Sequence, residues 1–320
     1  MAYRFGPGQP ISQNARAAGM EQTDRVLAHF SDGGKANAVH ESRKAIKRLR
    51  ALLRLIKPGM TKAAFRRDEA RLKEIARLLS GVRDMQAMIE TAAKLEAYDQ
   101  AVGAGPVGAA IKARLGQECA EAEKRLKGGA IGRARKLLAE ARKAFAGLTL
   151  EDDDFAVIAK TLESDYRKAR RGFASAYRLG KDEAFHEWRK HVQRHWRQLV
   201  LVAPSWSKAL RPQVALARDL AEMLGEDHDL SVLAGRVKAD AKQLGPAPQV
   251  RAYLELCRRR QAELRSLAEP LAARLLAEKP ASLAARLTAY WRTAPRLEGA
   301  DPDAKAAKDS NVIALKRSPR

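Results

Sequence analysis

The sequence repeats one basic pattern at a long interval, and this repeat constrains the fold more than any other feature. The residues that match at an offset of 146 are His40 with His186, Arg43 with Arg189, Lys44 with Lys190 and Arg48 with Arg194. A second element follows in each copy, where residues 79–85 parallel residues 224–230 at an offset of 145. This period is too long for a solenoid unit, so it predicts a duplicated helical subdomain.

The first copy, residues 40–54, predicts an amphipathic helix with a cationic face. It contains neither Gly nor Pro, and most of its residues are good helix formers. At 100° per residue, the cations gather opposite the apolar residues. The basic face holds His40, Arg43, Lys44, Lys47 and Arg54, flanked by Arg48 and Arg50, and the apolar face holds Ala45, Ile46, Leu49, Leu52, Leu53 and Ile56. One such helix alone is typical of a solvated surface.

The second copy keeps this pattern with two changes. Its basic residues lie within about 160° of one another on a helix and are His186, Arg189, Lys190, Arg194 and Arg197. Gln193 stands at the Lys47 position, and Trp196 at the Arg50 position. A third basic segment precedes this copy and contributes Arg167, Arg170 and Arg171. Two related basic helices in one chain make a solvated surface the poorer explanation.

The composition indicates an all-α protein with a polyanionic partner. Hydrophobic residues make up 46% of the chain but aromatic residues only 5%, which favours helices over sheets. The 61 Lys and Arg residues exceed the 38 Asp and Glu residues, giving a formal net charge of +23. Two distant cysteines and the absence of an evident signal peptide or apolar run of about 18 residues predict a cytoplasmic protein without a transmembrane helix.

The chain divides into two helical halves and a tail. We expect a first bundle at 1–149, a second at 150–296, and a disordered basic tail at 297–320. Ser12 is expected to cap the first helix. The acidic run 151–154 is expected in the first turn of a helix that reaches about residue 179. Separate helices are expected at 207–225 and 228–243.

These paired motifs resemble the CHAD family, the conserved histidine α-helical domain. The residues that carry the resemblance are His40, Arg43, Lys47, Arg48 and Arg50, their second copy His186, Arg189, Arg194 and Arg197, the 79–84 and 224–229 elements, Tyr3 to Phe5, and Tyr166 with Arg167. The resemblance covers about residues 1–295. It implies two bundles of four-helix type, related by pseudo-twofold symmetry, with a basic groove or channel between them.

The resemblance also implies binding of inorganic polyphosphate and association with polyphosphate granules, without catalysis, metal or cofactor. Polyphosphate carries about one charge per phosphate and has no bases to read, so it suits Arg and Lys held on rigid helices. Protonated His40 and His186 would add charge-assisted hydrogen bonds. The expected contact residues are His40, Arg43, Lys44, Lys47, Arg48, Arg50, Arg54, Arg167, Arg170, Arg171, His186, Arg189, Lys190, Arg194 and Arg197.

Three alternatives remain open from the residues alone. His186, His191 and His195 lie close in sequence, but no acidic residue joins them at a zinc-site spacing, so packing is favoured. Asp84 and Asp229 occupy matched positions, where a helix cap or a salt bridge to a motif arginine is simpler than catalysis. Weak, non-specific RNA or DNA binding through the same basic surface is the alternative function.

Overall fold

The structure is a computed structural model that describes residues 3–31, 36–103, 105–125 and 129–297, and in these ranges it contains helices and no strand. The helices are α1 (Ile11–Ser31), α2 (Ala36–Leu55), η1 (Lys57–Gly59), α3 (Lys62–Leu78), α4 (Ser80–Tyr98), α5 (Gln100–Gly103), α6 (Pro106–Arg125), α7 (Ile131–Ala146), α8 (Ala156–Leu179), α9 (Asp182–Val202), η3 (Ala203–Trp206), α10 (Ser207–Ala239), α11 (Ala241–Leu244), α12 (Ala247–Leu275) and α13 (Pro280–Leu297). The all-α prediction is confirmed.

The first basic helix, α2, buries the face that the sequence predicted. All six apolar residues of that face are at most 5% exposed, and they are Ala45, Ile46, Leu49, Leu52, Leu53 and Ile56. Each aliphatic side chain buried in this way contributes about 1.5–3 kcal/mol. Packing against α1 and α3 therefore fixes the rotation of α2 about its axis and leaves its cations on the opposite side.

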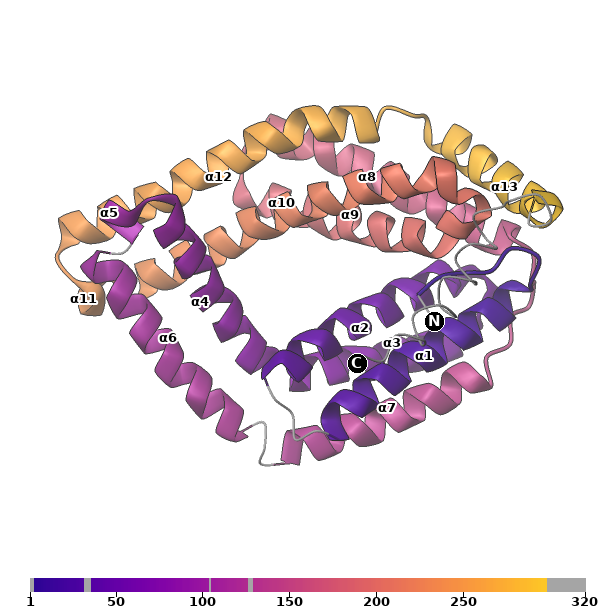
Figure 1. Ribbon diagram of the computed structural model, residues 1–320, viewed down its shortest axis with the longest axis horizontal. Helices are drawn as coiled ribbons and strands as arrows, with labels where there is room; N and C mark the ends of the chain where they lie inside the picture. Colours follow the sequence, from indigo (N-terminus) through magenta and orange to yellow (C-terminus); the bar gives the residue numbers. More distant parts are fainter. Residues whose placement is uncertain (1–2, 32–35, 104, 126–128, 298–320) are drawn as a thin grey trace, which may run out of the picture.

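Two apolar cores hold the helices, and they do not coincide with the two sequence halves. The larger core joins α1, α2, α3 and α7 with α8, α9, α13 and the first part of α10. The smaller core joins α4 and α6 with the second part of α10 and the first part of α12. Figure 1 shows this second group extending away from the remaining helices. Because helices from both halves share each core, the halves are built to fold together.

The N-terminal segment ties the two basic helices together. Tyr3 and Phe5 are buried, at 4% and 0% exposure. The Tyr3 hydroxyl donates to the Arg48 carbonyl at 2.9 Å, and the Phe5 amide donates to the Leu201 carbonyl at 2.8 Å. One short strand-like segment thus bonds to α2 on one side and to α9 on the other.

The hairpin of α8 and α9 positions the second basic helix. Gly180 ends α8 with a φ of 64°, a left-handed conformation that favours glycine. Asp182 and Glu183 lie in the first turn of α9, where negative charge suits the helix dipole. Phe185 and Trp188 are buried, so they hold α9 against its neighbours with the cations on the other side.

The acidic run 151–154 precedes α8 and does not lie in its first turn, so this expectation is corrected. The Ser12 amide and hydroxyl donate to the Asp153 carboxylate at 2.5 and 2.6 Å. Asp153 thus bonds the first turn of α1, and Ser12 donates its bonds there instead of capping that helix. The helix α8 starts only at Ala156, whose amide donates to Asp154 Oδ1 at 2.8 Å.

The predicted break between residues 225 and 228 is also wrong. α10 continues through Gly225 without interruption, whereas the matching region of the first half changes from α3 to α4 at Leu79. Burial of Leu224, Asp227 and Leu230 on one side of α10 supports a continuous helix, because tertiary packing overrides the low helix propensity of glycine.

Two further predictions concern the C-terminal tail and the absence of a transmembrane helix. The predicted tail at 297–320 lies, apart from Leu297, outside the described residues. Within the ranges that the structure describes, none of the helices combines the length and apolar character that a membrane crossing requires.

Candidate functional site

The cations of α2 form one stripe along the helix. Arg43, Lys47, Arg50 and Arg54 follow one another at intervals of three or four residues, so they share a face. On α9 the same interval links His186, Arg189, Gln193 and Arg197. This spacing explains why Arg197, one position beyond the match to Arg50, continues the α9 stripe.

The structure brings the two stripes together. α2 contacts α9 directly along part of its length, although 146 positions separate the matched residues. The positive charges of Arg197, Arg43 and Arg189 all act on Lys47. Lys47 therefore lies within electrostatic range of cations from both halves of the chain.

Lys47 lies among several positive charges. Its side chain is accessible to solvent, yet the surrounding protein removes enough water to disfavour its ammonium ion. This desolvation, together with repulsion from Arg197, Arg43 and Arg189, lowers the pKa of Lys47 to about 8. Burial and nearby cations lower the pKa of Arg197 in the same way, to about 10.

Four cations in this region have no direct acidic partner. No carboxylate in the described part of the chain lies within 4.0 Å of these residues, which we call the central cations: Lys47, Arg50, Arg189 and Arg197. The Nε atoms of Arg50 and Arg189 are buried without a hydrogen-bond partner in the same ranges. Native proteins pair most buried donors, so these guanidinium groups are suited to an external acceptor.

Other predicted cations are neutralised in part. Arg43 bonds to Asp84 at 3.0 Å and to the Leu79 carbonyl at 3.3 Å, so the expected salt bridge of Asp84 to a motif arginine is confirmed. Arg54 pairs with Glu69 at 2.7 Å. The exposed Lys44 and Lys190 pair with the preceding acids of their own helices, which are Glu41 and Glu187.

Arg48 and Arg194 occupy matched positions beside the two basic stripes, but they have different hydrogen-bond partners. Arg48 Nη1 donates to the neutral amide oxygen of Gln22 on α1 at 3.3 Å. Arg194 Nη1 instead donates to the buried carboxylate of Asp165 on α8 at 3.0 Å. Gln198 also donates to Asp165, at 2.7 Å. Arg194 is therefore held inside the protein as half of an ion pair.

The three predicted cations of α8 do not join the central cations through any contact in the described residues. Arg167 pairs with Glu163 on its own helix and is exposed. Arg170 lies within electrostatic range of Tyr166, whose hydroxyl donates to the Leu275 carbonyl at the end of α12. Arg171 is exposed. This segment therefore faces other neighbours than the α2 and α9 stripes do.

The two matched histidines have different neighbours. His40 lies near Arg83, and burial together with that charge lowers the pKa of His40. His186 Nδ1 is 2.9 Å from His228 Nδ1, so one ring donates and the other accepts. Burial and the charges of Arg189 and His186 lower the pKa of His228 to about 4. Both rings of this pair are therefore neutral near pH 7 in the free protein.

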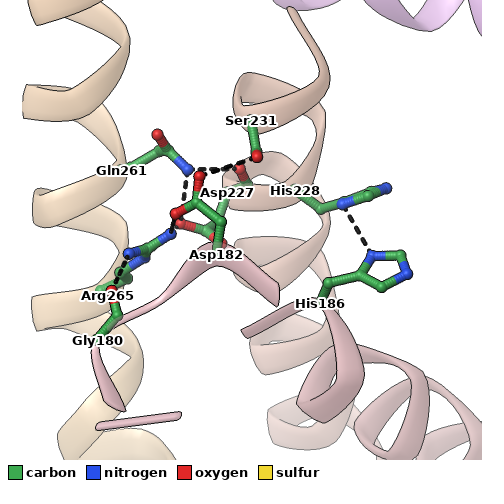
Figure 2. Close-up of polar contacts among 8 residues, drawn as sticks. All are labelled: Gly180, Asp182, His186, Asp227, His228, Ser231, Gln261 and Arg265. Atoms are coloured by element: carbon green, nitrogen blue, oxygen red, sulfur yellow. Dashed lines mark hydrogen bonds and ion pairs between the residues drawn. The ribbon is translucent and has the colours of Figure 1, made fainter. Parts of the chain in front are cut away.

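A second polar network lies beside the histidine pair, as Figure 2 shows. Arg265 of α12 donates from Nε to Asp227 at 2.7 Å and from Nη2 to Asp182 at 2.5 Å. The Ser231 hydroxyl donates to the same Asp182 at 3.0 Å. These bonds join the start of α9 to α10 and α12, and they set the positions from which His186 and His228 meet.

Sequence reasoning missed His228, and it considered Asp229 only for a cap, a salt bridge or catalysis. Both lie in the 224–230 element, and His228 stands at the position that matches Arg83. A basic residue at both matched positions was the available signal. Tyr3 is a further neighbour of the site, because its hydroxyl lies near Arg197 and Arg48.

His195, one of the histidines considered for zinc, packs in the interior. His195 is 2% exposed, and its ring lies 5.0 Å from that of Tyr166. Burial lowers the pKa of His195 to about 4. In the ranges that the structure describes, no group of three or more His, Cys, Asp or Glu side chains is arranged to hold a metal ion.

Comparisons with known proteins identify the family. The sequence model of the CHAD domain matches residues 17–238, which is more than half of the chain. The chain belongs to the CHAD domain family. Both basic stripes and the 224–230 element of this CHAD protein lie inside the matched region.

The fold is also similar to that of a solved structure, PptA from Streptomyces chartreusis. The two share 13% sequence identity with a TM-score of 0.56, and the match covers 87% of this chain and 100% of that one. This likeness extends the common fold beyond the region matched by the family. No curated protein matches the sequence.

Proposed function

We propose that this CHAD protein binds inorganic polyphosphate, without catalysis, in a basic groove between α2 and α9. The single observation that supports it is the gathering of Lys47 with Arg189 and Arg197, from both halves, while no carboxylate lies within 4.0 Å of any central cation in the described residues. Mutual repulsion makes this arrangement unfavourable in the free protein. A chain of phosphates would relieve that repulsion at several positions at once.

The chemistry of the central cations fits a repeating phosphate chain. Three of the four are arginines, whose planar fork bonds two phosphate oxygens. The cations project from long helices that the apolar cores hold in place, so little ordering entropy is lost on binding. We further propose that the matched helices reflect an internal duplication with pseudo-twofold symmetry, and that the protein associates with polyphosphate granules.

Competition between polyanions tests this function against non-specific nucleic-acid binding. Single-stranded RNA also carries about one charge per phosphate but adds bases, and an aromatic content of 5% provides few stacking surfaces. Long-chain polyphosphate is expected to displace a fluorescent single-stranded RNA at matched phosphate concentration and fixed salt. Retention of the RNA under these conditions would contradict the assignment and favour general nucleic-acid binding.

The absence of catalysis is tested in the same preparation. Polyphosphate incubated with the protein and Mg²⁺ or Mn²⁺ is expected to keep its chain length on a gel and to release no orthophosphate. Metal-dependent release that requires the central cations would show that the protein is an enzyme.

A further inference from the structure

One carboxylate stands among the central cations. Asp229 of α10 is half-buried and lines a pocket of about 570 Å³ together with Gln193 of the α9 stripe, Lys94, and three further acidic residues, Asp219, Glu222 and Glu226. Its charge acts on both Lys47 and Arg189. Burial raises the pKa of Asp229, and the charges of Arg189 and Lys47 oppose that rise. This carboxylate therefore contributes negative potential at Lys47 and Arg189, two of the central cations.

Asp229 differs from its counterpart in the first half. Asp84, at the matched position, accepts a hydrogen bond from Arg43 at 3.0 Å and so orients that cation. Asp229 makes no ion pair within 4.0 Å in the described part of the chain. It therefore does not orient Arg189 by direct contact and acts through its electric field alone.

We propose that Asp229 attenuates anion binding at the central cations, so that only an anion long enough to make further contacts binds tightly. This inference rests on the proposed function. The carboxylate lowers the local attraction for every incoming anion by a similar factor. A short anion makes few other contacts and is excluded, whereas an extended polyphosphate also engages Arg50 and Arg197 and retains its affinity.

The test measures polyphosphate and tripolyphosphate affinity for the full chain and for Asp229→Asn by isothermal titration calorimetry at low salt. Removing one charge near a partly exposed site is expected to tighten binding of both anions about 5- to 10-fold. The gain should shrink as salt is added. A role in orienting Arg189 would instead weaken binding in the variant.

A matched control removes a charge from the same pocket without touching the central cations. Glu222 lines that pocket, is 68% exposed, and lies 3.8 Å from Arg218. Glu222→Gln makes the same change in net charge and is expected to alter affinity less than about 2-fold. Thermal unfolding establishes that each variant is folded, and Asp229→Ala removes the same charge if Asp229→Asn does not fold.

The outcomes separate the two proposals. Tighter binding in Asp229→Asn, with little change in Glu222→Gln, supports the inference. Unchanged or weaker binding in folded Asp229 variants overturns it, as does an equal gain in Glu222→Gln. Absence of polyphosphate binding by the unsubstituted chain would overturn the proposed function, and this inference with it.

Discussion

α2 and α9 carry the same basic pattern, but the neighbouring helix neutralises it differently in each half. Arg48 of α2 meets the neutral Gln22 of α1, whereas Arg194 at the matched position meets the buried Asp165 of α8. Two matched positions can therefore hold the same residue type, yet only one of the two arginines keeps a charge that is not paired with a carboxylate in the part of the chain that the structure describes. The helix packed behind decides whether an arginine is available or is part of the interior.

The same difference extends to the histidines. His40 lies beside Arg83, which pairs with Glu90 at 2.7 Å. His186 lies against His228, a second titratable ring. On α9 the stripe continues through Arg189 and Arg197, so the shift of one arginine from the Arg50 position leaves a cation on the same face. Both helices thus supply two of the four central cations.

The largest expected effect concerns the ion pair behind α9. Asp165→Asn removes the charge that compensates Arg194 and leaves a partly buried guanidinium without a carboxylate, so it is expected to lower the free energy of unfolding by about 3 kcal/mol. Gln22→Met, the matched change behind α2, removes only a neutral acceptor and should cost about 1 kcal/mol. Urea unfolding of both variants measures the difference. Equal losses of unfolding free energy would contradict the claim that Arg48 and Arg194 are held differently in the two halves.

The next effect is a pH dependence of binding that arises on α2. Because the pKa of free Lys47 is about 8, this ammonium is charged at pH 7 and mostly neutral at pH 9. Bound polyphosphate favours the charged form, so binding above pH 8 requires proton uptake. Polyphosphate affinity is therefore expected to fall about tenfold between pH 7 and pH 9.

Lys47→Arg is the control for this pH dependence. Arginine keeps its charge throughout the range, so the variant should bind at pH 9 about as tightly as at pH 7. Titrations in buffers of different ionisation enthalpy would measure the proton uptake directly. A fall of equal size in Lys47→Arg would show that another group titrates.

A smaller effect is expected from the histidine pair of α9. His186 and His228 have lowered pKa values in the free protein, and bound phosphate would raise them. Affinity should therefore increase by a few-fold as the pH falls from 7 to 6. His228→Phe is expected to remove part of this increase, and an unchanged pH profile between 6 and 7 would exclude the pair from the site.

The smallest effect is expected from the tail. Residues 298–320 contain five basic and four acidic side chains, a formal net charge of +1. Removing them should change polyphosphate affinity less than about 2-fold at fixed salt. A larger loss of affinity would show that polyphosphate binding depends mainly on the tail and not on the basic helices α2 and α9.

The sequence predicted the features that follow from periodicity and missed those that follow from tertiary contact. The buried face of α2 and the approach of Lys47 to Arg189 follow from helical spacing and the repeat. The bond from Ser12 to Asp153 and the ion pair of Arg194 with Asp165 join residues far apart in the chain. No local pattern indicates which carboxylate such a donor meets.

The helix boundary at Gly225 illustrates the same limit. A glycine in a helical pattern weakens a helix by about 1 kcal/mol, which predicts a break there. Burial of Leu224 and Leu230 on α10 outweighs that cost. The division into halves at 149 and 150, and the residue contacts with polyphosphate, stay predictions.

The most direct test of the central claim compares two double variants on the same pair of helices. Lys47→Ala with Arg189→Ala removes two central cations, whereas Lys44→Ala with Lys190→Ala removes two exposed lysines that pair with acids of their own helices. Both variants lose the same charge. A polyphosphate titration at fixed salt is expected to show about a 100-fold loss of affinity in the first and less than about 3-fold in the second. Equal losses would contradict a defined site between α2 and α9.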